Sequence, residues 1–175
     1  MKAIINTLRS ITPPRMIREA LALYGTMEMP GAKNNPVIVN WAKETLIKDD
    51  NWYNADSIPW CGLFMAIVAQ RSRWPVPQLP LSALSWARFG KATDTAMLGD
   101  VLVFTRKGGG HVGLYVGESD TTYYVLGGNQ SDKVCISELS KARIHAIRRP
   151  PYRVQPDSVK QYIYSSSGEV STNEQ

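Results

Sequence analysis

The chain has 175 residues, of which 43% are hydrophobic, and these values predict one globular domain with a substantial core. Its longest strongly apolar run, residues 63–69, is too short to span a bilayer, so we expect no stable membrane insertion. The formal net charge is +5, but the lysines and arginines are scattered and form no basic helix face, so we expect no nucleic-acid partner.

The first half of the chain shows the periodicity of helices. Prolines or polar capping residues mark the starts of these helices, and glycines mark two of their ends. The predicted helices cover residues 12–25, 35–51, 59–72 and 82–90. Residues 1–11 are only weakly patterned.

Beyond residue 100 the apolar residues alternate, as they do in half-buried strands. The predicted strands cover residues 101–105, 112–116, 122–126, 133–137 and 144–147. Their even spacing, with Gly and Asp at the turns, indicates an antiparallel meander of about five strands. Helices followed by strands predict an α+β fold with the helices packed on one side of the sheet. We place the domain at residues 1–155 and expect residues 156–175 to form a polar, flexible tail.

Cys61 lies in the first turn of the helix predicted over residues 59–72, after Pro59 at the expected first helical position. Unpaired backbone N–H groups and the helix dipole at such a place stabilise a thiolate and lower the pKa of the thiol. Cys61 is therefore a candidate nucleophile, which iodoacetamide should modify faster than Cys135. An ordinary core cysteine gives the same pattern. Cys135 lies between apolar residues of a predicted strand and is interpreted as inert and buried.

His111 is the candidate base, because a cysteine nucleophile needs a proton acceptor and the chain holds only two histidines. It follows three glycines and opens a predicted strand. The core face of that strand is predicted to carry Val112, Leu114 and Val116. His111 then lies on the other face with Gly113, which leaves room beside the imidazole. A surface histidine at a loop-to-strand junction is the alternative, and His145 is interpreted as a sheet-face histidine without a function.

Asn129 is the candidate for orienting the imidazole ring. It follows the strand predicted over residues 122–126, in Leu126-Gly127-Gly128-Asn129-Gln130. In an antiparallel pair, a residue past the end of the second strand returns near the start of the first, where its side chain would fix the tautomer of His111. Asn129 equally fits a turn residue in the left-handed conformation, and both interpretations stay open.

Other chemistries have weaker support. The four histidines and cysteines show none of the short spacings of a zinc site. The glycines at 108–110 precede a histidine and a strand, unlike those of a phosphate-binding loop. Glu28, Asp56 and Asp100 stand in loops without a feature that marks a glycosidase pair. We therefore expect no metal and no cofactor.

Several motifs occur together in a defined order. They are Pro59-Trp60-Cys61, Gly99-Asp100-Val101-Leu102-Val103-Phe104, Gly110-His111-Val112-Gly113 and Leu126-Gly127-Gly128-Asn129-Gln130. This ordered set resembles the NlpC and CHAP superfamily of papain-like cysteine hydrolases, over roughly residues 14–150. The similarity is greatest to small single-domain cell-wall hydrolases of phages and bacteria, which also share the pattern of residues 24–31.

The resemblance implies a papain-like fold in which Cys61 is the nucleophile and His111 its base. Members carry His, Glu, Asn or Gln at the third position, where Asn129 is the candidate. The implied substrate is an amide of peptidoglycan, in the stem peptide or at the muramoyl–alanine linkage. The Cys61 backbone N–H would bind the oxyanion, with Asp56 or Tyr53 as possible additional partners.

We expect a monomeric endolysin, synthesised in the cytoplasm without a signal peptide or transmembrane helix, that acts on the cell wall after release. Two alternatives stay open. One is a thiol hydrolase or acyltransferase of the same fold with a different substrate. The other is a non-catalytic module that binds the wall or belongs to a virion.

Overall fold

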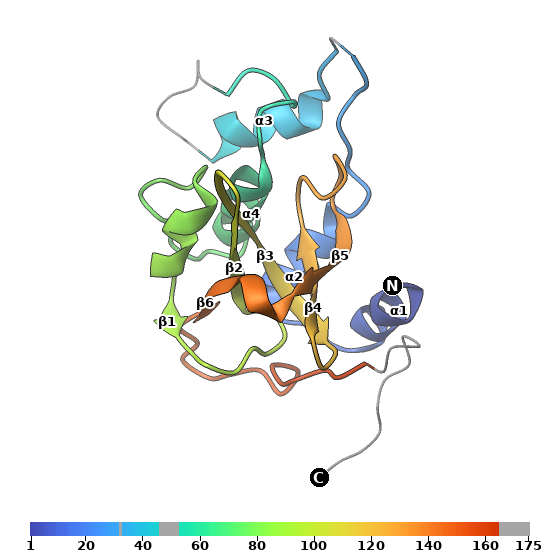
Figure 1. The fold of residues 1–175 in the computed structure, drawn as a ribbon, viewed down its shortest axis with the longest axis vertical. Helices are drawn as coiled ribbons and strands as arrows, with labels where there is room; N and C mark the ends of the chain where they lie inside the picture. The colour runs from blue at the N-terminus through green and yellow to red at the C-terminus, as the bar shows by residue number, and fades with distance from the viewer. Residues whose placement is uncertain (32, 46–52, 165–175) are drawn as a thin grey trace.

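The computed structural model describes residues 1–31, 33–45 and 53–164 (Figure 1). Its α-helices are α1 (Lys2–Ser10), α2 (Arg15–Ala22), α3 (Pro36–Glu44) and α4 (Cys61–Arg71), and its 3₁₀ helices are η1 (Ala83–Arg88) and η2 (Lys141–Arg143). Its strands are β1 (Lys91–Ala92), β2 (Val101–Arg106), β3 (Gly109–Glu118), β4 (Thr122–Gly127), β5 (Cys135–Ser140) and β6 (Ile144–Arg149). The predicted α+β fold class is confirmed.

The strands form one antiparallel sheet in the order β1-β6-β2-β3-β4-β5. The meander predicted from strand spacing holds from β2 to β5, but β6 crosses back and pairs with β2. Arg143, just before β6, donates from Nε to the carbonyl oxygen of Thr105 in β2 at 3.1 Å. The sheet of the described residues has six strands where about five were predicted, because the two-residue strand β1 is too short to show an alternating pattern.

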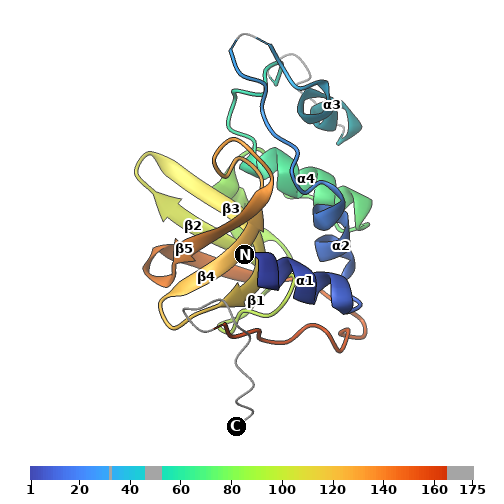
Figure 2. The same cartoon turned by 90° about the vertical axis from the view of Figure 1, so that its right-hand side faces the viewer.

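The sheet has an apolar core on each face. Helices α1, α2 and α4 lie on one side of it, as Figure 2 shows. The core on that side includes the sheet residues Val101, Val103, Val112, Leu114, Val116 and Leu126. The core on the other side is smaller and contains Ala96, Leu102, Phe104, Tyr115, Tyr123 and Val125. The predicted core face of β3 is therefore confirmed, and its other face is also partly covered.

Helix α4 is buried along nine consecutive residues, Cys61 to Ala69, because it packs between β3 and the helices α2 and α3. It begins at Cys61 with Trp60 as its N-cap, two residues after the Pro59 predicted as its first residue. Helix α3 begins as predicted, with the Asn35 side chain accepting from the N–H of Val37 at 2.9 Å. Its predicted end near residues 49–51 lies outside the described residues.

Both ends of the described chain bury side chains in the core, which the sequence did not predict. Helix α1 lies in the weakly patterned stretch and buries Ile4 and Leu8, which are spaced for one helix face. In the predicted tail, Val159, Tyr162 and Tyr164 are buried, so the packed body continues past residue 155. None of the helices of the described ranges is both long and apolar enough to span a membrane.

Candidate functional site

Cys61 occupies the N-terminal end of the central helix, against strand β3. As the first residue of α4 it has an N–H without an intrahelical acceptor, as do Gly62 and Leu63. The backbone N–H groups of Val112 and Gly62 face the Cys61 thiol and favour its thiolate. Only 6% of Cys61 is exposed. The structure thus confirms the predicted place of this cysteine at a helix start.

Two glycines allow the close approaches that hold this helix start. A Cβ on Gly62 would lie 2.4 Å from the carbonyl oxygen of Pro80, so only glycine lets residues 80–81 pack against the first turn of α4. A Cβ on Gly128 would lie 2.5 Å from Cβ of Phe64 and 2.7 Å from Cζ3 of Trp60. The turn after β4 therefore presses directly on the helix that carries Cys61.

His111 lies in β3 opposite Phe104 of β2, and its Nε2 lies 3.0 Å from Oε1 of Gln130. The amide group of Gln130 is fixed by its nitrogen, which donates to the carbonyl oxygens of Val125 at 3.1 Å and Cys135 at 2.6 Å. Two carbonyl partners identify this atom as the nitrogen, so the oxygen faces the ring. An amide oxygen only accepts, which places the ring proton on Nε2 and leaves Nδ1 free to accept a proton.

The residue predicted to orient the ring was Asn129, and the structure places Gln130 there instead. Asn129 has φ of +54°, in the left-handed region, and among the described residues no hydrogen bond joins it to His111. The turn-residue interpretation of Asn129 is therefore the one that the structure supports. A left-handed residue at 129 reverses the chain, which turns the next side chain back under β4. That consequence of the Gly-Gly-Asn turn is the signal that could have identified Gln130.

Gly113 was predicted to leave room beside the imidazole, and this prediction is wrong. A Cβ on Gly113 would lie 2.5 Å from Cγ1 of Val125, so the Val125 side chain fills that space. The glycine is needed because β4 packs there. The glycine next to the ring is instead Gly127. A Cβ added to Gly127 would lie 3.4 Å from Nε2 of His111.

Cys61 and His111 are connected only through the backbone of β3, on which His111 shares the face of Phe104 and Val112 lies on the helix side. The Val112 N–H that faces the thiol belongs to the residue after His111, so the thiol and the imidazole approach neighbouring positions of one strand. None of the hydrogen bonds of the described residues joins the two side chains directly. The arrangement holds a thiol and an imidazole with an available Nδ1 at one end of the sheet.

Burial keeps both groups neutral in the free protein. It raises the pKa of the Cys61 thiol, and this effect outweighs the N–H groups of Val112 and Gly62 and the charge of Arg106, which lower it. Burial also lowers the pKa of His111 to about 4, against the opposing bond to Gln130 and with help from Arg106 and Arg143. The prediction that the helix start lowers the thiol pKa therefore fails here, because desolvation is the larger effect.

The possible oxyanion partners have other contacts. Oδ2 of Asp56 accepts the N–H groups of Met29 at 2.9 Å and Asn35 at 2.7 Å, which ties two loops together. The Tyr53 hydroxyl donates to the carbonyl oxygen of Ile58 at 3.2 Å. Both side chains therefore have structural partners, and the backbone N–H groups at the start of α4 are the available donors.

Glu28 and Asp100, the other acidic residues considered for catalysis, also have structural partners. Glu28 accepts from Nε1 of buried Trp60 at 2.7 Å, beside Cys61. Asp100 is fully buried and forms a bidentate pair with Arg149, at 3.0 and 2.8 Å. Among the described residues there is no cluster of three His, Cys, Asp or Glu side chains suited to a metal ion.

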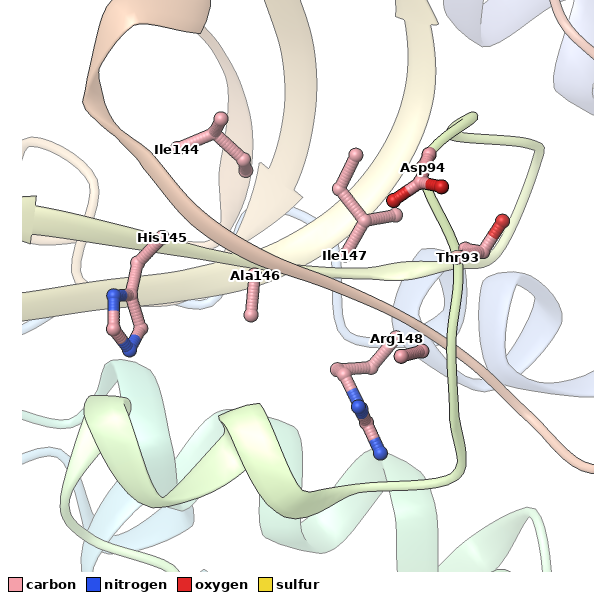
Figure 3. Close-up of a pocket in the computed structure, with 8 residues that line it drawn as sticks. Thr93, Asp94, Ile144, His145, Ala146, Ile147 and Arg148 are labelled. Carbon is pink, nitrogen blue, oxygen red and sulfur yellow. The ribbon is translucent and has the colours of Figure 1, made fainter.

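The second histidine and the second cysteine differ in their surroundings. His145 is exposed and lines a shallow hollow of about 390 Å³, where Figure 3 shows it and Arg148 extending from one side of β6. Cys135 is half-buried, where full burial was predicted, and its Sγ lies 3.3 Å from the carbonyl oxygen of Gln130. Cys135 is thus part of the packing around Gln130.

A scan against the models of known protein families found no match for this chain, and a search of the curated proteins found none either.

Proposed function

We propose that this protein is a peptidoglycan hydrolase in which Cys61 attacks an amide carbonyl of the cell wall and His111 is its base. The observation that carries the proposal is the contact of 3.0 Å between His111 and Gln130, next in the chain to Val112, whose backbone N–H faces the Cys61 thiol. Nucleophile, base and a third group that orients the base form the arrangement that thiol hydrolysis requires. Gln130 takes the third position in place of Asn129.

The neutral resting state supports a general-base route. Nδ1 of His111 accepts the thiol proton as Sγ of Cys61 adds to the carbonyl carbon, and the carbonyl π electrons move to oxygen. The tetrahedral intermediate collapses, the C–N bond breaks, and the amine leaves with the proton from His111. Water, activated by the same nitrogen, then hydrolyses the thioester and releases a carboxylic acid and the thiol.

The helix start supplies the electrostatic part of the mechanism. The unpaired N–H groups of Cys61 and Gly62 point out of the end of α4, where the helix dipole adds positive potential. Backbone donors of this kind contribute about 3 kcal/mol each when they bind a developing oxyanion. No side chain has to supply this stabilisation.

The choice of peptidoglycan rests on the four ordered motifs and their resemblance to the NlpC and CHAP superfamily of papain-like hydrolases. The net charge of +5 is consistent with an anionic polymer as partner. As an endolysin, the protein would be made in the cytoplasm and act as a monomer on the wall after release. The bond cut would lie in the stem peptide or at the muramoyl–alanine linkage.

Digestion of purified peptidoglycan tests the proposal. Wild type should release fragments that carry one new amine and one new carboxylate, and mass spectrometry of these fragments identifies the bond. Cys61→Ala should release none, whereas Cys135→Ala, which also removes a thiol, should retain activity. Intact walls after incubation with wild-type protein would contradict the proposal.

A non-catalytic wall-binding module is the second candidate. The observations that favour it are the 6% exposure of Cys61 and the raised pKa of its thiol, both typical of a core cysteine. Equal binding of wild type and Cys61→Ala to walls, without release of fragments by either, would support this candidate. Cleavage of a different amide or ester, with walls left intact, would support a thiol hydrolase or acyltransferase with another substrate.

A further inference from the structure

An arginine that the mechanism does not use lies on the same face of the sheet as the imidazole. Arg106 is the last residue of β2 and pairs with Gly109 across the β2–β3 hairpin, two positions from the pair of Phe104 with His111. Opposed residues of an antiparallel pair share a face, and so do residues two apart in a strand. Arg106 is therefore placed on the face that carries His111, at the turn that joins β2 to β3.

A second arginine is held beside the end of β2. Nε of Arg143 donates to the carbonyl oxygen of Thr105 at 3.1 Å, and the Thr105 hydroxyl donates to the carbonyl oxygen of Arg143 at 3.4 Å. The charges of Arg106 and Arg143 both lower the pKa of His111, and that of Arg106 also lowers the pKa of the Cys61 thiol. Arg106 thus affects the pKa of both reacting groups, and Arg143 affects that of His111 alone.

Within residues 1–31, 33–45 and 53–164, Arg106 has no anionic partner. Some arginines are paired, as Arg71 is with Glu44 and Arg149 with Asp100. Arg106 is exposed, and its side chain has no ion pair or hydrogen bond in the described part of the chain. The hairpin tip is also open, because a Cβ on Gly108 or Gly109 would meet no atom within 4 Å. An unpaired guanidinium beside an open hairpin is suited to receive a carboxylate from outside the chain.

We infer that Arg106, with Arg143 next to it, binds a free carboxylate that the substrate carries close to the scissile amide. This inference rests on the proposed hydrolase function and makes it more specific. The preferred substrate is a peptide amide with an ionised acidic group near the cleaved bond, and amidation of that group weakens recognition. The bound carboxylate also offsets the positive charge that disfavours a protonated His111 during the reaction.

The test compares soluble peptidoglycan fragments whose peptide carboxylates are either free or amidated. Wild type should cleave the free acid with a kcat/KM about tenfold higher, the ratio typical of one hydrogen bond to a charged group. Arg106→Gln should abolish this preference, and Arg106→Lys should keep part of it. Lys107→Gln, which removes the neighbouring positive charge of the same hairpin, is the matched control and should keep the preference.

Binding to Cys61→Ala separates failure of the inference from failure of the hydrolase proposal. Fluorescence anisotropy with labelled fragments measures this binding. Cys61→Ala should bind the free-acid fragment more tightly than the amidated one, and the added Arg106→Gln change should remove this difference. Equal affinity for the two fragments, or a preference that survives Arg106→Gln, overturns the inference even where wild type cleaves the wall. An Arg106-dependent preference in binding without cleavage by wild type supports carboxylate recognition and contradicts the hydrolase proposal.

Discussion

Nε2 of His111 and Oε1 of Gln130 lie 3.0 Å apart, and this contact determines which ring nitrogen can act as a base. Gln130 has both amide hydrogens engaged by the carbonyl oxygens of Val125 and Cys135, which lie in neighbouring strands. The glutamine is therefore rigidly oriented before any substrate binds. An oriented acceptor holds the imidazole in one tautomer without adding negative charge beside it.

Removal of this acceptor should slow catalysis more than it weakens substrate binding. We expect Gln130→Ala to lower kcat by about a hundredfold, within the range for loss of a positioned acid–base group, with little change in KM. Steady-state kinetics on solubilised peptidoglycan measure both constants. Asn129→Gly is the matched control, because glycine adopts the left-handed conformation of Asn129 without strain and should retain kcat. Equal losses in the two variants would refute an orienting role for Gln130.

Burial of the His111 imidazole should make the fold sensitive to mild acid. Its pKa of about 4 lies below the ordinary value of 6.5, so between these values the unfolded chain binds a proton that the folded one does not. The stability gained from a neutral His111 is complete above pH 6.5 and is lost as the pH falls toward 4, by about 3 kcal/mol.

Urea unfolding at several pH values between 7.5 and 4 measures this effect. The comparison is with His111→Gln, which cannot titrate at this position and should lose less stability over the same range. Because all other groups are common to both proteins, the difference between the two curves isolates His111. Parallel curves would mean that the imidazole is not desolvated in the folded protein.

The two thiols should react in the order opposite to that predicted from the sequence. Burial raises the pKa of Cys61 and leaves 6% of the residue exposed, whereas Cys135 is half-buried. At pH 7.5 iodoacetamide should therefore alkylate Cys135 faster than Cys61, since reaction needs an accessible thiolate. Peptide mapping by mass spectrometry gives both rates in one sample. Faster labelling of Cys61 would show that the helix start outweighs burial.

The periodicity of the sequence predicted most of the strands and three of the four described α-helices. The alternation of Val112, Leu114 and Val116 specified which face of β3 meets the helices, because a side-chain period of two leaves only one choice. The return of β6 to β2 was not predictable in this way. It depends on contacts such as that of Arg143 with Thr105, which join positions far apart in the chain.

Of the three residues proposed for the site from the sequence, Asn129 is replaced by its neighbour Gln130 as the residue that contacts the ring. Cys61 and His111 are marked by local patterns, a helix start and a glycine-led strand. Whether position 129 or 130 faces the ring depends on the conformation of the turn, and the sequence leaves that open. The protonation states depend on how much protein covers each group, which only the folded structure provides.

The first turn of α4 should not tolerate a methyl group at position 62. Alanine favours a helix over glycine by about 1 kcal/mol, but the added Cβ would lie 2.4 Å from a backbone oxygen of Pro80. Overpacking of this kind costs about 1–3 kcal/mol, so we expect Gly62→Ala to lower stability and to displace Cys61. Thermal unfolding and wall digestion measure the two effects. Gly109→Ala is the control and should change neither stability nor activity, because its added Cβ would meet no atom within 4 Å. A Gly62→Ala protein as stable and active as wild type would show that Pro80 does not restrict position 62.

The Asp100–Arg149 pair should contribute to stability without taking part in catalysis. Asp100 is fully buried, and Arg149 holds its carboxylate with two hydrogen bonds at the start of β2. Replacement of Arg149 by Met leaves that carboxylate without its charged partner, and we expect a loss of about 3–5 kcal/mol in the free energy of unfolding. The added change Asp100→Asn removes the stranded charge and should recover part of the loss. Urea unfolding followed by tryptophan fluorescence measures both, with the exposed Arg153→Met as the control that should match wild type. A similar small loss for Arg149→Met and Arg153→Met would mean that the buried pair does not stabilise the fold.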